Sequence, residues 1–331
     1  MRNTTHFDLS RTVTFRRGSR AVLGYWGTNL QNPSGDMCEM YPADPGKAMI
    51  QVDQSGADAK CVAYLCPDGN FRQLFLNAIK PHVFVAMHIF KDHWAKNGHP
   101  YVMDYCKLKP RELPLQAGWK ALANTIKNHE RYYFIGKKTC HSANYRMQAS
   151  TFRFDILEAS EGVIVLTLKE AELFLSMYHD LFPEIKQVWH KEIERDLNET
   201  RTLRTLQGYP RYFGQAWSEA LLREATAFVP QGTVAIITAL AVQRLQTYIE
   251  EKGKDDWDIL NDKHDSYLGQ CNDNPDNIEE MKTVMLDFMQ QELVSPRGEK
   301  FKMGAAASVG YNWGKFDVNN PEKNPKGLKE L

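Results

Sequence analysis

The sequence lacks an excess of charge of either sign. Lysine and arginine total 41, and aspartate and glutamate also total 41, so the formal net charge of the 331 residues is zero. Domains that bind nucleic acid usually carry a basic excess, which is missing here. The balance does not exclude such a partner, because basic side chains can line a cleft while acidic ones gather at a metal site.

Paired cysteines are also missing. No two of the six cysteines form a CxxC pair, and no Cys/His cluster has the spacing of zinc ligands. A zinc finger is therefore not expected. Reduced thiols in a cytosolic setting fit this pattern better than a disulfide framework does.

Long hydrophobic runs and a targeting leader are absent from the sequence. The first residues, MRNTTHFDLSRT, contain no apolar core of a signal peptide. The longest apolar run, residues 233–242, is too short to cross a bilayer. We therefore expect a soluble, cytoplasmic protein with no membrane partner.

What the sequence does contain is typical of a globular protein. Hydrophobic residues make up 43% of it, and the length suits one large domain or two smaller ones. Residues 1–47 are predicted to be mostly irregular. Strands are predicted at 48–52 and 162–168, and a β-hairpin with a polar turn at 257–271. Helices are predicted at 72–95, 115–148, 168–200, 215–250 (interrupted near Pro230 and Gly232) and 276–293. Strands and helices without regular alternation predict an α+β fold.

Two carboxylates lie where a hard cation could bind. Asp53 follows the apolar strand 48–52, and Asp265 lies with His264 in the predicted hairpin turn. Carboxylates at such positions can coordinate Mg²⁺, and adjacent strands could bring the two together. Taken singly, each aspartate is explained as simply by a strand cap or a turn.

The segment GKKTCHSANYRM, residues 136–147, carries a second pattern. Lys137, His141 and Tyr145 are four residues apart, so they share one face of a helix. A cation, an imidazole and an aromatic ring in a row can bind phosphates and a stacked base. An amphipathic helix with an inward ring and a solvated lysine explains the same spacing.

Several segments, in order, resemble family A DNA polymerases of the bacteriophage type. The matches cover about residues 25–317 and are GTNLQNPS (27–34), VDQSGADAKCVAYL (52–65, motif A), KPHVFVAMHIF (80–90), GKKTCHSANY (136–145, motif B), LFPEIKQVW (181–189), QGYPRYF (207–213), REATAFVPQGTVA (223–235), DILNDKHDSYL (258–268, motif C) and VGYNWGKFD (309–317). This resemblance implies a template-directed DNA polymerase that acts on primer-template DNA and dNTPs. For a phage protein, the compartment would be the host cytoplasm.

The resemblance also implies roles for individual residues. Asp53 and Asp265, with the carbonyl of Gln54, would hold two Mg²⁺ ions for phosphoryl transfer. The residues implied to bind the nucleotide are Asp58, His82, Lys137, His141 and Tyr145. The residues implied to bind DNA are Arg223, Gln231 and His264.

The sequence departs from the family pattern at several positions. Asp58 replaces the longer Glu that excludes a ribose hydroxyl, which predicts weakened rejection of ribonucleotides in an incorporation assay. Tyr133 stands where a triphosphate-binding Arg is expected, so either Lys138 substitutes for Lys137 or Arg131 reaches the phosphates. The other departures are Arg146 for Gly, Ala227 for Asn and Ser266 for Glu.

The resemblance implies a right-hand architecture without thumb or exonuclease. Residues 1–26 would be a remnant of the thumb-to-palm connection, with fingers at about 70–180 and palm at 40–70 and 180–331. A separate polypeptide would carry the thumb and exonuclease. The alternatives are a catalytically impaired DNA-binding relative and an unrelated metal-dependent nuclease that uses the same two carboxylates.

Overall fold

The computed structural model describes residues 6–8, 18–20, 33 and 35–330. The predicted thumb remnant and the segment 27–34 therefore lie mostly outside the described residues. Two short strands within the first 26 residues, β1 (His6–Asp8) and β2 (Gly18–Arg20), pair with each other in antiparallel fashion.

A five-stranded antiparallel sheet forms one half of the molecule, with strand order β11-β10-β3-β7-β6. Its strands are β3 (Lys47–Gln54), β6 (Asp258–Lys263), β7 (Ser266–Asn272), β10 (Ala305–Gly310) and β11 (Lys329–Glu330). β3 is central because its apolar residues are buried on both faces. The predicted strand and hairpin are both confirmed, and the polar turn of the hairpin is His264–Asp265.

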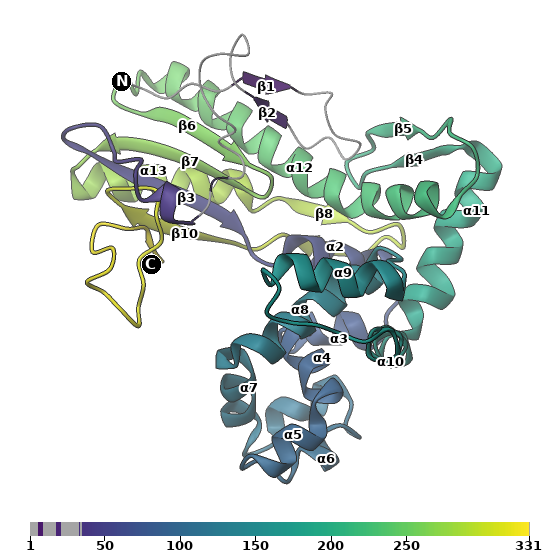
Figure 1. Cartoon of the computed structure of the whole chain (residues 1–331). Helices are drawn as coiled ribbons and strands as arrows, with labels where there is room; N and C mark the ends of the chain where they lie inside the picture. The colour runs from purple at the N-terminus through teal and green to yellow at the C-terminus, as the bar shows by residue number, and fades with distance from the viewer. Residues whose placement is uncertain (1–5, 9–17, 21–32, 34, 331) are drawn as a thin grey trace.

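Helices α12 (Glu219–Lys252) and α13 (Pro275–Met289) pack against this sheet (Figure 1). In the part of the chain that the structure describes, α12 is the one helix long and apolar enough to span a membrane, but 72% of its most apolar window is buried inside the protein. It is therefore placed as a core helix. The predicted interruption near Pro230 and Gly232 is wrong, because α12 runs through both residues.

The other half of the molecule is helical (Figure 1). Its elements are α2 (Ala57–Leu65), α3 (Asn70–Leu76), α4 (Pro81–Ile89), α5 (Lys91–Lys96), α6 (Val102–Tyr105), η1 (Pro110–Leu115), α7 (Trp119–Asn128), α8 (Glu130–Asn144), α9 (Ala149–Ala159), α10 (Leu168–Leu181), η2 (Ile185–Trp189) and α11 (His190–Thr200). Three predicted long helices are divided into shorter ones. The divisions fall where Pro81 starts α4, where His129 caps α8, and at Phe182 before η2.

The strand predicted at 162–168 is wrong, because this segment pairs with no strand before α10 begins. The burial of its side chains nevertheless alternates along the segment. Ile164 and Leu166 are buried against the helical core, whereas Val163 and Val165 are exposed. The segment is thus extended without a neighbouring strand to complete a ladder.

Two small hairpins complete the fold, one between α11 and α12 in the chain and one between α13 and β10. β4 (Thr202–Arg204) pairs with β5 (Pro210–Tyr212), and β8 (Glu292–Val294) pairs with β9 (Lys300–Lys302). The short helix α1 (Gly35–Cys38) precedes the sheet. The predicted α+β class, with an antiparallel sheet and an inserted helical part, is confirmed.

Candidate active site

The end of β3 and the β6–β7 turn bring Asp53 and Asp265 together. In the sheet register Asp53 lies opposite Ser266, the residue that follows Asp265. The backbone N–H of Gln54 donates to the carbonyl of Asp265 at 2.8 Å. The two aspartates, 212 positions apart in a 331-residue sequence, therefore lie side by side, Asp53 near the end of β3 and Asp265 in the turn just before the neighbouring strand β7.

The two aspartates affect each other electrostatically. Although part of its side chain is open to solvent, desolvation by the surrounding protein and then the negative charge of Asp265 raise the pKa of Asp53 from 3.8 to about 6. Lys315 and Lys263 oppose this rise, so both lie near enough to act on Asp53. The two lysines therefore offset only part of the effect of desolvation and of Asp265 on the pKa of Asp53.

This donor set fits a divalent cation. Carboxylate and carbonyl oxygens are the ligands that Mg²⁺ prefers, and a cation between two like charges relieves their repulsion. Asp53, Asp265 and the carbonyl of Gln54 supply such oxygens. Among the described residues, no group of three or more His, Cys, Asp or Glu side chains is arranged to hold a metal. A third carboxylate ligand is therefore not found there.

The raised pKa gives a stability prediction for Asp53→Asn. A carboxyl group whose pKa is higher in the folded than in the unfolded protein destabilises the folded state when it is ionised. For Asp53 this destabilisation is fully present above about pH 6 and is lost as the pH falls toward 3.8. We expect the metal-free variant to be more stable than wild type at about pH 7.5, by about 1 kcal/mol after solvent screening. Thermal unfolding at about pH 7.5 and about pH 4 measures this difference, and an advantage of equal size at both pH values would contradict its origin in Asp53 ionisation.

Helix α8 carries the predicted nucleotide-binding face. Lys137 and His141 are exposed on it, and both lie close enough to His82, at the start of α4, to affect its ionisation. Burial, followed by the charge of Lys137, lowers the pKa of His82 to about 4, so this imidazole is neutral at physiological pH. The structure thus brings together His82, Lys137 and His141.

Close packing of α4 on α8 makes this arrangement possible. A Cβ atom on Gly136 would lie 2.7 Å from the backbone oxygen of His82 and 2.9 Å from the Cβ of Ala86. Only glycine permits this approach of the two helices without a shift. α8 also contacts α2, the helix that follows Asp53.

Two of the predicted nucleotide-binding cations interact on other sides of α8. Lys138 forms an ion pair with Asp155 of α9, with a distance of 3.0 Å between Nζ and Oδ2. Arg131 lies near the start of α10, where its charge helps lower the pKa of Glu170 after the hydrogen bonds from Thr167. Lys138 is thus engaged with α9 and Arg131 acts on the start of α10, whereas Lys137 acts on His82.

Tyr145 and Arg146 end α8. Tyr145 is buried, and its ring contacts that of His141 edge to face at a centroid distance of 4.9 Å. Arg146 has φ = 59°, in the left-handed region that favours glycine, and its guanidinium forms an ion pair with Glu194 of α11. The glycine expected at this position is explained by this backbone conformation, which arginine adopts at some cost in strain.

The remaining predicted residues lie on the elements that flank the carboxylates. Asp58 is in the first turn of α2. Arg223 and Gln231 are half-buried on α12, and His264 has φ = 52° in the β6–β7 turn. Lys263 and Lys315, which act on Asp53, were not predicted. Lys263 could have been suggested by its place beside His264 and Asp265, but no local pattern marks Lys315.

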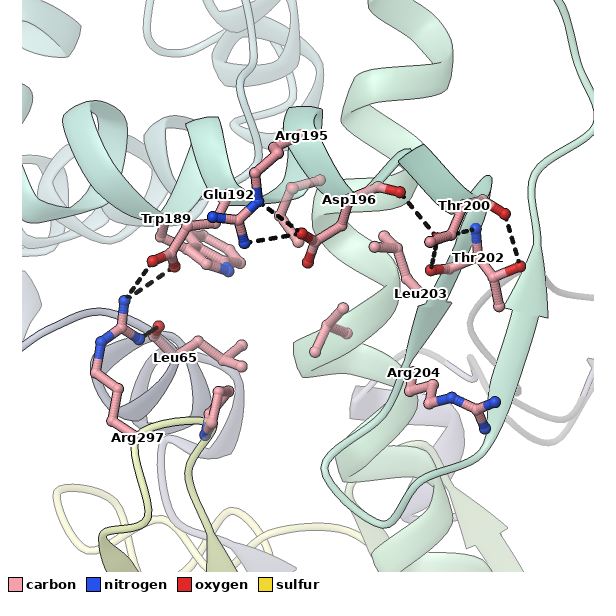
Figure 2. Close-up of a pocket in the computed structure, with 13 residues that line it drawn as sticks. Leu65, Trp189, Glu192, Arg195, Asp196, Thr200, Thr202, Leu203, Arg204 and Arg297 are labelled. Carbon is pink, nitrogen blue, oxygen red and sulfur yellow. Dashed lines mark hydrogen bonds and ion pairs between the residues drawn. The ribbon is translucent and has the colours of Figure 1, made fainter. Parts of the chain in front are cut away.

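A separate cavity of about 700 Å³ lies between α11, β4, α12 and the loop joining β8 to β9 (Figure 2). None of the predicted site residues lines it. On one side of it, the guanidinium of Arg297 donates to both carboxylate oxygens of Glu192 at 2.8 and 2.9 Å and to the carbonyl of Leu65. These bonds fasten the β8–β9 hairpin to α2 and α11.

Comparison with known proteins supports the fold. No protein-family model and no curated protein sequence matches the chain. A solved structure, the POL domain of Pol1 from M. smegmatis in complex with DNA primer-template and dNTP, is similar with a TM-score of 0.67 and 17% sequence identity. The similarity covers 93% of this chain and 47% of that one, so the chain spans about half the length of its neighbour. The chain therefore has the fold of a DNA polymerase domain.

Proposed function

We propose that this protein is a template-directed DNA polymerase module that adds deoxynucleotides to the 3′-end of a primer. The observation that carries the proposal is that Asp53, near the end of β3, lies beside Asp265, in the turn just before the adjacent strand β7, within a polymerase-domain fold. The sheet half would act as the palm and the helical half as the fingers. Primer extension with Mg²⁺ and all four dNTPs tests the proposal.

In this mechanism the residues of the chain bind and orient the reactants. Asp53, Asp265 and the carbonyl of Gln54 would hold two Mg²⁺ ions, which when bound supply positive charge at the attacking and leaving oxygens. Lys137 neutralises charge on the triphosphate. His82, neutral because its pKa is about 4, donates one hydrogen bond to a phosphate oxygen.

Other residues would position the sugar, the base pair and the DNA. His141 packs against the sugar of the incoming nucleotide, with Asp58 near its 2′ position. Tyr145 supports His141 by its edge-to-face contact, at a centroid distance of 4.9 Å. Arg223 and Gln231 on α12 contact the minor groove, where acceptor positions are shared by all correct pairs. His264 lies against the primer terminus.

The ion pair of Lys138 predicts which lysine binds the triphosphate. Lys137→Gln is expected to raise the KM for dNTP about tenfold, because a charge-assisted contact to phosphate is lost. Lys138→Gln is expected to leave KM within about twofold, since Lys138 is engaged with Asp155. Steady-state single-nucleotide incorporation measures both. A larger KM effect from Lys138→Gln would reverse the assignment.

A catalytically impaired DNA-binding relative is the second candidate. It is favoured by Tyr133, which replaces an expected cation, and by Arg146, whose ion pair with Glu194 ties the end of α8 to α11. A bacteriophage role, and a partner polypeptide with thumb and exonuclease, are proposals that rest on the sequence resemblance. Extension assays with and without the products of neighbouring genes separate these possibilities.

A further inference from the structure

Helix α12 is hydrogen-bonded to both segments that carry the carboxylates. The side-chain amide of Gln54 donates to the carbonyl of Val234 at 3.1 Å and to the hydroxyl of Thr238 at 2.9 Å. The hydroxyl of Thr238 donates to the carbonyl of His264 at 3.0 Å. Gln54, Val234 and Thr238 are each at most 2% exposed, so water does not compete for the two bonds that Gln54 donates.

The direction of each bond follows from the chemistry of the groups. A backbone carbonyl only accepts, so the amide nitrogen, not the oxygen, of Gln54 must face Val234. The same nitrogen donates to Thr238, whose single proton can go to the carbonyl of His264 at 3.0 Å or to that of Val234 at 3.4 Å, and the shorter bond is to His264. The chain of donors therefore runs from β3 through α12 to the β6–β7 turn.

These bonds fix the backbone on either side of the metal site. Gln54 follows Asp53, and His264 precedes Asp265 in a turn with φ = 52°, a conformation that costs energy for a non-glycine residue. The bond from Thr238 to the carbonyl of His264 holds this turn. The backbone bond from Gln54 to Asp265 links the turn directly to β3. A single hydroxyl thus connects the neighbours of both aspartates.

Stability alone does not explain this network. The side-chain oxygen of Gln54 is buried and has no hydrogen-bond partner among the described residues. An unmatched buried acceptor costs free energy that an apolar residue of similar size would avoid. The network is therefore better explained by its position between the neighbours of Asp53 and Asp265 than by a gain in stability.

We propose that Thr238 is a positioning residue for the metal-binding carboxylates. Its hydroxyl sets the spacing of Asp53 and Asp265 through Gln54 and His264. The proposal rests on the proposed function for its role in catalysis, but its effect on metal affinity can be measured without any reaction. Groups that orient metal ligands typically contribute tenfold or more to metal affinity.

The test is Mn²⁺ binding to the full chain without DNA or nucleotide, measured by calorimetry. Thr238→Val keeps the shape of the side chain but removes the hydroxyl, and we expect the dissociation constant to rise about tenfold. Thr238→Ser restores the hydroxyl and is expected to bind within about twofold of wild type. Thr226→Val is the matched control, because Thr226 is buried on the same helix and its hydroxyl, among the residues that the structure describes, bonds only the carbonyl of Leu222.

The outcomes separate positioning from stability and from polymerase activity. Both valine variants lose a buried hydroxyl, so both should lower the melting temperature, but only Thr238→Val should weaken Mn²⁺ binding. Equal weakening by Thr226→Val, or normal binding by Thr238→Val, would overturn the proposal, as would a wild type that binds no Mn²⁺. Mn²⁺ binding with the expected pattern but no primer extension would refute only the proposed function.

Discussion

Primer extension is expected to fall by about a thousandfold or more when Asp265 is replaced by asparagine. Asparagine has nearly the same size but lacks the negative charge that holds a hard cation. The bond that Asp265 accepts from Gln54 uses the backbone carbonyl, so the β6–β7 turn is kept in the variant. Loss of extension would therefore report on chemistry at the carboxylate and not on unfolding.

The measurement compares wild type, Asp265→Asn and a matched control on one primer-template with Mg²⁺ and four dNTPs. Asp287→Asn is the control, because it is the same substitution at an exposed position on α13. DNA binding is followed in parallel by fluorescence anisotropy. Extension by Asp265→Asn near the wild-type rate would contradict the mechanism. Binding without extension by wild type would favour the impaired relative or a missing partner, and DNA degradation without nucleotides would favour a nuclease.

The strand end at Asp53 and the turn at Asp265 could be predicted because each lies in a short local pattern. An apolar strand ending in Asp53, and a polar turn containing Asp265, each predict their own structure from neighbouring residues. Their meeting in space follows from pairing of β3 with β7, which no local pattern specifies. Only the order of the motifs along the chain, matched to a family, linked the two aspartates before the structure was known.

Elements were mispredicted where distant packing outweighs local preference. Pro230 costs a helix about 3 kcal/mol, which predicts a break in α12. The neighbouring residues Phe228 and Val234 are fully buried, one in each of the two cores that α12 joins. Burial of side chains of this size contributes about 1.5–3 kcal/mol each, enough together to offset the proline.

The side chains that tune the site were harder to predict than those that form it. Lys315 lies about 260 residues after Asp53 in the sequence but affects its ionisation. Thr238 sits in an apolar run where a threonine is unremarkable. The choice between Lys137 and Lys138 likewise depended on Asp155, a residue on a different helix. Such contacts are set by tertiary structure and leave no trace in local sequence.

The second large effect is expected on the free energy of unfolding when Gly136 is replaced. At this position helix propensity predicts a gain in stability from alanine, and packing predicts a loss. Replacing glycine by alanine within a helix favours folding by about 1 kcal/mol. Here any Cβ would come within 2.7 Å of the His82 backbone oxygen, and overpacking of this kind costs about 1–3 kcal/mol or more. We expect Gly136→Ala to lower the free energy of unfolding by about 1 kcal/mol and the larger Gly136→Val by about 3 kcal/mol.

Urea denaturation of both variants measures these changes, with Gly304→Ala as the control. A Cβ at Gly304 meets only the Cβ of Ser55 at 3.8 Å, an ordinary contact, so that variant should stay within about 0.5 kcal/mol of wild type. A more stable Gly136→Ala would mean that α4 and α8 are not held as closely as described. The close approach of α4 and α8 at Gly136 also sets His82 beside Lys137. Separation of the two helices should therefore raise the KM for dNTP as well, so the packing at this glycine supports the proposed nucleotide site.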